Sequence, residues 1–132
     1  MSKERSISRD PHDAVELQFL QKVALRLPGD IEVLQALADL YTRNGKYEDG
    51  LAIDQQLSHL LPTDDLVWYN LGCSYALTDH ADESFEALTQ AIELGYGDSD
   101  WMKADPDLGN LHKDPRFESL LSWLYTACHE EE

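Results

Sequence analysis

The chain has 132 residues, 42% of them hydrophobic, and carries a formal net charge of -16 at pH 7. This length and apolar content are typical of one globular domain, and no apolar stretch is long enough to span a bilayer. The acidic balance argues against nucleic acid and anionic membranes as partners, because such binding depends on Lys and Arg. Residues 1–12 are polar and lack the apolar centre of a secretory signal. We therefore expect a flexible N-terminus and a cytoplasmic protein.

Amphipathic segments follow one another along the chain, separated by turn residues. Residues 13–27 carry a stripe of Val15, Phe19, Val23 and Leu27, which we expect to pack against the following helix. Apolar residues then recur at spacings of three and four over residues 31–41, 47–61, 66–76 and 81–92. This is the periodicity of helices with one buried face. The sequence lacks a strand-length alternation of apolar and polar residues, so it predicts an all-α fold.

A period of 34 residues runs through these segments. Pro28, Pro62 and Tyr96 stand 34 residues apart, each at a point where turn residues end one segment and begin the next. A fixed period of this length is typical of helical repeat proteins. The period divides residues 13–97 into a half repeat and two full repeats, with the boundaries 13–30, 31–64 and 65–98.

The second full repeat carries a recognisable signature. Trp68, Leu71, Gly72 and Tyr75 follow the pattern Trp-x-x-Leu-Gly-x-x-Tyr, and a late alanine follows at Ala91. In this pattern and in its period the chain resembles the tetratricopeptide repeat (TPR) family. The resemblance implies a right-handed solenoid of helical hairpins, with capping helices at both ends.

Residues 99–132 are expected to form the C-terminal cap and an acidic tail. Asp105-Pro106 and Asp114-Pro115 each combine an N-cap residue with proline at the first helical position. They predict a short helical turn and then a longer helix, and the segment resembles one that follows TPR units in many bacterial proteins. The longer helix offers an apolar face to the repeats, formed by Phe117, Leu120, Leu121, Leu124 and Tyr125.

The sequence offers little that points to catalysis or metal binding. Cys73 and Cys128 lie far apart and are expected to be free thiols, because disulfides are rare in a reducing cytoplasm. The five histidines fall on separate elements without the spacing of metal ligands. A nucleophile would need a base and an orienting group within reach, and the sequence shows no such set. We therefore expect neither an enzyme, nor a cofactor, nor a metal site.

The resemblance to TPR proteins also implies a binding groove, since the first helices of successive repeats line a concave surface in that family. By position, the groove residues here are Gln35, Asp39, Thr42, Arg43, Leu66, Tyr69, Asn70, Cys73 and Leu77. Tyr69 is expected to be an exposed aromatic anchor, because Trp68 takes the packing position beside it. Some TPR proteins grip a carboxylate with lysines and asparagines. Only Asn70 matches that clamp, and an acid at Asp39 opposes it.

These features together predict a non-enzymatic interaction module, an adaptor or scaffold that binds a protein or peptide of apolar and basic character in the groove. The alternative is a dedicated chaperone that holds one client, such as a substrate of type III secretion. A monomer or a weak homodimer is expected, because a short solenoid can associate through an uncovered end.

Overall fold

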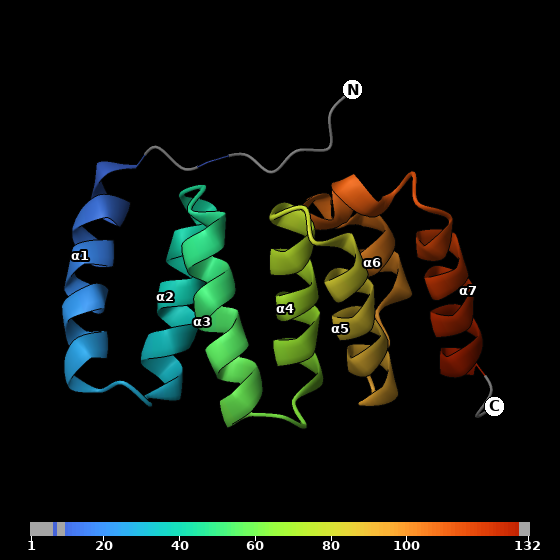
Figure 1. Cartoon of the computed structure of the whole chain (residues 1–132), viewed down its shortest axis with the longest axis horizontal. Helices are drawn as coiled ribbons and strands as arrows, with labels where there is room; N and C mark the ends of the chain where they lie inside the picture. Colours follow the sequence, from blue (N-terminus) through green and yellow to red (C-terminus); the bar gives the residue numbers. More distant parts are fainter. Residues whose placement is uncertain (1–6, 8–9, 130–132) are drawn as a thin grey trace.

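The computed structural model describes residue 7 and residues 10–129, and these form helices without any strand. The elements are α1 (Pro11–Arg26), α2 (Ile31–Arg43), α3 (Tyr47–Leu60), α4 (Asp65–Leu77), α5 (Ala81–Glu93), α6 (Ser99–Ala104), the 3-10 helix η1 (Pro106–Leu111) and α7 (Pro115–His129). Figure 1 shows the longer helices side by side in a row, so that consecutive helices are neighbours in space. The predicted all-α fold is confirmed.

Aspartates begin most of these helices. The carboxylates of Asp30 and Asp64 accept hydrogen bonds from backbone amides in the first turns of α2 and α4, which satisfies amides that lack a partner within the helix. Asp10 caps α1 in the same way, so this helix begins at Pro11, inside the segment expected to be flexible. The rest of that segment (residues 1–6 and 8–9) and the acidic tail (residues 130–132) lie outside the described residues.

The 34-residue period is also present in three dimensions. Helices α2 and α4 begin at residues 31 and 65, and α3 and α5 begin at residues 47 and 81, so each pair is offset by 34. The same offset relates two hydrogen bonds between side chains. Gln21 Nε2 donates to Tyr41 Oη at 2.9 Å, and Gln55 Nε2 donates to Tyr75 Oη at 3.2 Å. The contact between α1 and α2 is therefore repeated in the contact between α3 and α4.

The hydrophobic core is most extensive between α4, α5 and the C-terminal segment. Leu88 of α5, Met102 of α6 and Leu124 of α7 are completely buried there. Helices α4 and α5 pack closely because Gly72 has no side chain, and a Cβ at this position would come within 2.7 Å of Leu88 Cδ2. This end of the row is the best-covered part of the molecule.

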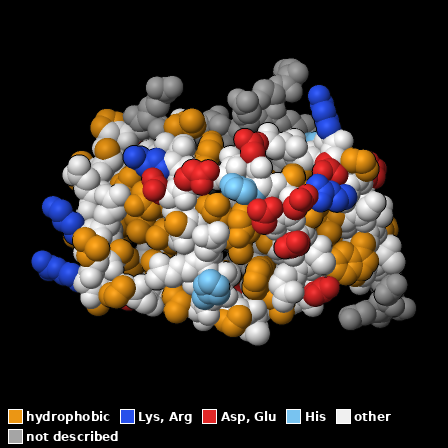
Figure 2. All heavy atoms as spheres, viewed as in Figure 1, with side chains coloured by type: hydrophobic (Ala, Val, Ile, Leu, Met, Phe, Trp, Pro, Cys, Tyr) orange, Lys and Arg blue, Asp and Glu red, His pale blue; other side chains and the backbone are white. Residues whose placement is uncertain are grey.

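Helix α1 packs with a different face from the one predicted. Leu17 is buried and contacts Leu37 and Leu40 of α2, whereas Val15 and Phe19 are 66% and 63% exposed. In Figure 2 hydrophobic side chains reach the visible surface at the α1 end of the molecule, on the left. The expected stripe was wrong because α1 carries two apolar stripes and has a helix on one side only, so only one stripe finds a partner.

The C-terminal segment covers the other end of the row much as predicted. Asp105 caps η1 by accepting from the amide of Asp107, and Asp114 accepts from the amide of Arg116 at the start of α7. The face of α7 is buried through Phe117, Leu120 and Leu124, with Leu121 half-buried, while Tyr125 points to solvent and not into the core. Helix α6 was not expected. None of the helices in the described chain has the length and apolar content needed to cross a membrane.

Candidate functional site

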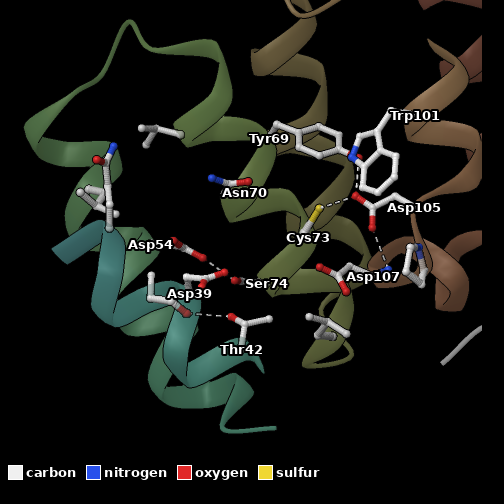
Figure 3. Close-up of a pocket in the computed structure, with 16 residues that line it drawn as sticks. Asp39, Thr42, Asp54, Tyr69, Asn70, Cys73, Ser74, Trp101, Asp105 and Asp107 are labelled. Atoms are coloured by element: carbon white, nitrogen blue, oxygen red, sulfur yellow. Dashed lines mark hydrogen bonds between the residues drawn. The ribbon is translucent and has the colours of Figure 1, made fainter. Parts of the chain in front are cut away.

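A hollow of about 280 Å³ lies between α2, α3, α4 and the segment that joins α6 to η1. Figure 3 shows Asp39, Thr42 and Asp54 on one side of it and Trp101, Asp105 and Asp107 on the other, with α4 between them. The structure gathers seven of the nine predicted groove residues around this hollow, namely Gln35, Asp39, Thr42, Tyr69, Asn70, Cys73 and Leu77. The first helices of the two full repeats thus face one shared concavity.

The two remaining groove residues do not line the hollow. Leu66 is 57% exposed in the first turn of α4. Arg43 turns toward α1, where its guanidinium pairs with the buried carboxylate of Asp13 at 2.9 Å and also with Asp39 at 3.0 Å. The hydrogen bond to Asp13 raises the pKa of Arg43. Arg43 is therefore engaged in the contact between α1 and α2 and is not among the residues that line the hollow, contrary to its predicted position.

Tyr69 forms part of the wall of the hollow and is not an exposed anchor. Its side chain is 4% exposed, and its ring stacks on Tyr96 with centroids 4.4 Å apart and planes 8° apart. Its hydroxyl donates to Asp105 Oδ2 at 2.7 Å. Burial, followed by the nearby Cys73 thiol and the contact with Asp105, raises the pKa of Tyr69 well above its ordinary value. The expectation of exposure failed because the C-terminal segment folds over this part of α4.

Cys73 lies beside Tyr69 and adjoins two carboxylates. Its Sγ lies 3.7 Å from Asp105 Oδ2. One ligand atom from each of Cys73, Asp105 and Asp107 lies within 4.8 Å of the others. Burial, with the charges of both aspartates, raises the pKa of the thiol, so it stays protonated, whereas nucleophiles and metal ligands are thiolates. Asp105 already accepts from Tyr69 and from the amide of Asp107. Hydrogen bonds thus connect Asp105 to both Tyr69 and Cys73.

Asp54 is the acidic group on the opposite wall. It comes from α3, is buried, and accepts a short hydrogen bond from the Ser74 hydroxyl of α4. Burial raises the pKa of Asp54 to about 6, although the Ser74 hydroxyl opposes this shift. A carboxyl group in this environment takes up its proton at a higher pH than an exposed one does, because burial disfavours the charged form.

Trp101 is the most prominent residue that the sequence did not indicate. It lies in α6 at the rim of the hollow with half of its surface exposed, and its amide donates to Asp98, the N-cap of α6. Figure 3 shows the indole beside Asp105. The sequence Asp98-Ser99-Asp100 could have indicated the helix as an N-cap signal. The position of its tryptophan over the hollow depends on the path of the chain after α5.

Three of the four aspartates that line the hollow, Asp54, Asp105 and Asp107, were also missed as site residues. Asp54 stands three residues after Leu51 and three before Leu57, on the buried face of α3, and an acid at such a position is a signal that the pattern contains. Asp105 was interpreted as a helix cap alone. Asp107 follows it by two residues, and both meet α4 only through tertiary contacts.

Comparison with known proteins gives a partial match. No family model matches the chain. An alignment of 84 positions, which covers 61% of the chain, is 32% identical to a chloroplastic protein of Arabidopsis thaliana. The chain spans a quarter of the length of that protein, 25%. The likeness therefore concerns one part of the relative.

Proposed function

We propose that the chain is a non-enzymatic interaction module of the tetratricopeptide type, a right-handed solenoid that binds a segment of a partner protein in the hollow. One observation carries the proposal: residues predicted from the repeat pattern to line a groove surround a real concavity, with an exposed tryptophan at its rim. Exposed aromatic residues beside a pocket are frequent binding hot spots. The 34-residue offset of helices and hydrogen bonds supports the assignment to the repeat family.

The dimensions of the hollow favour side chains of a longer segment over a small-molecule ligand. Pockets for drug-sized ligands enclose roughly 300–1,000 Å³, and this one, at about 280 Å³, is slightly smaller. A peptide that crosses α2 and α4 could insert one or two side chains here and contact the flanking polar residues Gln35 and Asn70, which are exposed. The predicted cytoplasmic location and the predicted state, monomer or weak homodimer, belong to the same proposal.

The proposal is tested by selecting binders from a displayed library of random peptides on the immobilised chain. Binding of selected peptides is then measured by fluorescence anisotropy. Asn70→Arg places a bulky side chain at the hollow and should weaken binding at least tenfold. Gln18→Arg adds the same charge on the exposed surface of α1 and should leave binding unchanged. A selection that yields no binder, or binders equally affected by both variants, would contradict the proposal.

A further inference from the structure

We propose that the side chain received by the hollow is an arginine of the partner segment, with its guanidinium between the carboxylates and stacked on Trp101. This inference rests on the proposed binding function and deepens it by naming the chemistry of the partner. It follows from the charge of the walls, from the aromatic rim and from the burial of the acidic groups.

The walls of the hollow carry acidic groups without any basic residue among them. Asp39, Asp54, Asp105 and Asp107 all line it, and the described lining residues include no Lys, Arg or His. Arg43, which lies outside this lining, pairs with Asp39 at 3.0 Å, so Asp54, Asp105 and Asp107 are the acids without a basic residue among their neighbours in the lining. The four carboxyl groups come from three separate parts of the chain, namely α2, α3 and the start of η1. A concave surface that gathers charge of one sign concentrates the electrostatic potential and attracts the opposite charge. The hollow is therefore complementary to a cation.

The burial of these groups strengthens that complementarity. Asp54 and Asp105 are 6% and 4% exposed, and their hydrogen-bond partners include the neutral Ser74 hydroxyl, Tyr69 hydroxyl, Cys73 thiol and Asp107 amide. A carboxylate offers about four lone-pair sites, so each can accept further donors. Interaction with a cation is stronger here than at an exposed surface, because the surroundings screen charge less than water does.

Trp101 distinguishes a guanidinium from other cations. Its indole is half exposed beside Asp105, so a flat group can lie on the ring and still reach a carboxylate. A guanidinium is planar, stacks on aromatic rings and donates from its edge, and it is less strongly hydrated than an ammonium group. A lysine would meet the carboxylates as a point charge and would gain less from the ring. The combination of ring and acid therefore favours arginine.

The test is a titration followed by two-dimensional ¹H–¹⁵N NMR of the full chain with three probes, N-acetyl-arginine amide, N-acetyl-lysine amide and N-acetyl-citrulline amide. Citrulline has nearly the shape of arginine without the charge. We expect the arginine probe to shift the Trp101 indole signal and the Asn70 amide signal, and to leave the Trp123 indole unchanged. The citrulline probe should bind about tenfold more weakly, because charge-assisted hydrogen bonds are roughly twice as strong as neutral ones. The lysine probe should also bind more weakly.

Two pairs of variants locate the effect. Trp101→Ala and Asp39→Asn remove the exposed ring and the exposed acid of the hollow and should each weaken arginine binding. Trp123→Ala and Asp49→Asn make the same changes at exposed positions of α7 and α3 away from the hollow and should not. Because all four residues are exposed or only partly covered, folding should survive each change.

The outcomes separate this inference from the proposed function. Equal binding of citrulline and arginine overturns the role of charge, and equal binding of lysine overturns the choice of a guanidinium. Absence of any shift at Trp101, or unchanged binding in Trp101→Ala, overturns the site. In each of these cases, library peptides whose binding is still weakened by Asn70→Arg would leave the interaction module standing.

Discussion

Replacement of Asp54 by asparagine should make the folded chain more stable at neutral pH. Asp54 is buried against Ser74, and burial raises its pKa from 3.8 to about 6. Between these two values the folded state holds a proton that the unfolded state releases. Stability therefore falls as the pH rises through this range, and the loss is complete above the folded pKa. Asparagine keeps an oxygen that can accept from Ser74 and carries no charge.

The size of the effect follows from the shift. A difference of about two pKa units corresponds to about 3 kcal/mol in the free energy of unfolding, at 1.36 kcal/mol per unit. We expect Asp54→Asn and the parent chain to differ little in their pH response below pH ~4. Above pH ~6 the variant should have gained about 3 kcal/mol relative to the parent.

Urea denaturation followed by circular dichroism at a series of pH values measures this difference. The difference between variant and parent is the useful quantity, because other carboxyl groups titrate alike in both chains and cancel. Asp49→Asn, at an exposed position of the same helix, is the matched control for the loss of a carboxyl group. A flat difference for Asp54→Asn, or a loss of stability that grows with pH, would refute the reasoning from burial.

Three further experiments test the packing. Gly72→Ala should destabilise by about 1–3 kcal/mol in urea denaturation, because the new Cβ would overlap Leu88; an increase in stability would show that the helices can separate at little cost. Leu17→Ala should lower the free energy of unfolding by about 2–5 kcal/mol, whereas Phe19→Ala should change it by less than about 0.5 kcal/mol. The reverse order would show that Phe19, and not Leu17, lies on the buried face of α1. Ellman's reagent should modify exposed Cys128 in the native chain and Cys73 only after unfolding, since Cys73 is buried with a raised pKa; equal native rates would contradict that burial.

The sequence predicted the helices and their period well because both depend on local signals. Asp30 and Asp64 announce the first helices of the two full repeats, and the structure places those helices at residues 31 and 65. Asp105 and Asp114 announce the helices of the C-terminal segment in the same way. An N-cap residue accepts hydrogen bonds from backbone amides two or three residues further along the chain. A few consecutive residues are therefore enough to predict where a helix begins.

The choice of buried face on α1 could not be made from helical spacing alone. Val15 and Phe19 are separated by four residues, and Leu17 and Leu20 by three, so either pair could form a buried stripe. The period contained the missing information, because Leu17, Leu51 and Phe85 stand 34 residues apart and all three are buried. Extending the repeat to the half repeat at the N-terminus would have identified the correct face.

The candidate site was predicted on one side only. Seven of the nine predicted groove residues, all from α2 and α4, line the hollow, whereas Arg43 and Leu66 of the same helices do not. The acidic wall and the tryptophan come from α3 and from the segment after α5. Asp105 meets Tyr69 across 36 residues of sequence, and no periodicity relates such a contact to the repeats. Tertiary packing of the C-terminal segment decides it.

The C-terminal segment has two roles in this molecule, and they coincide at Tyr69. It covers the last helix pair, since Tyr69 packs in the same core as Met102 and Leu108. It also supplies one wall of the hollow, because Asp105 binds the Tyr69 hydroxyl and Trp101 stands at the rim. Changes at Tyr69 or Asp105 should therefore affect folding and binding together, which makes them poor probes of the site. Trp101 lines the hollow with an exposed indole, so its replacement should affect binding with little effect on folding. It is therefore the better residue for testing the binding chemistry.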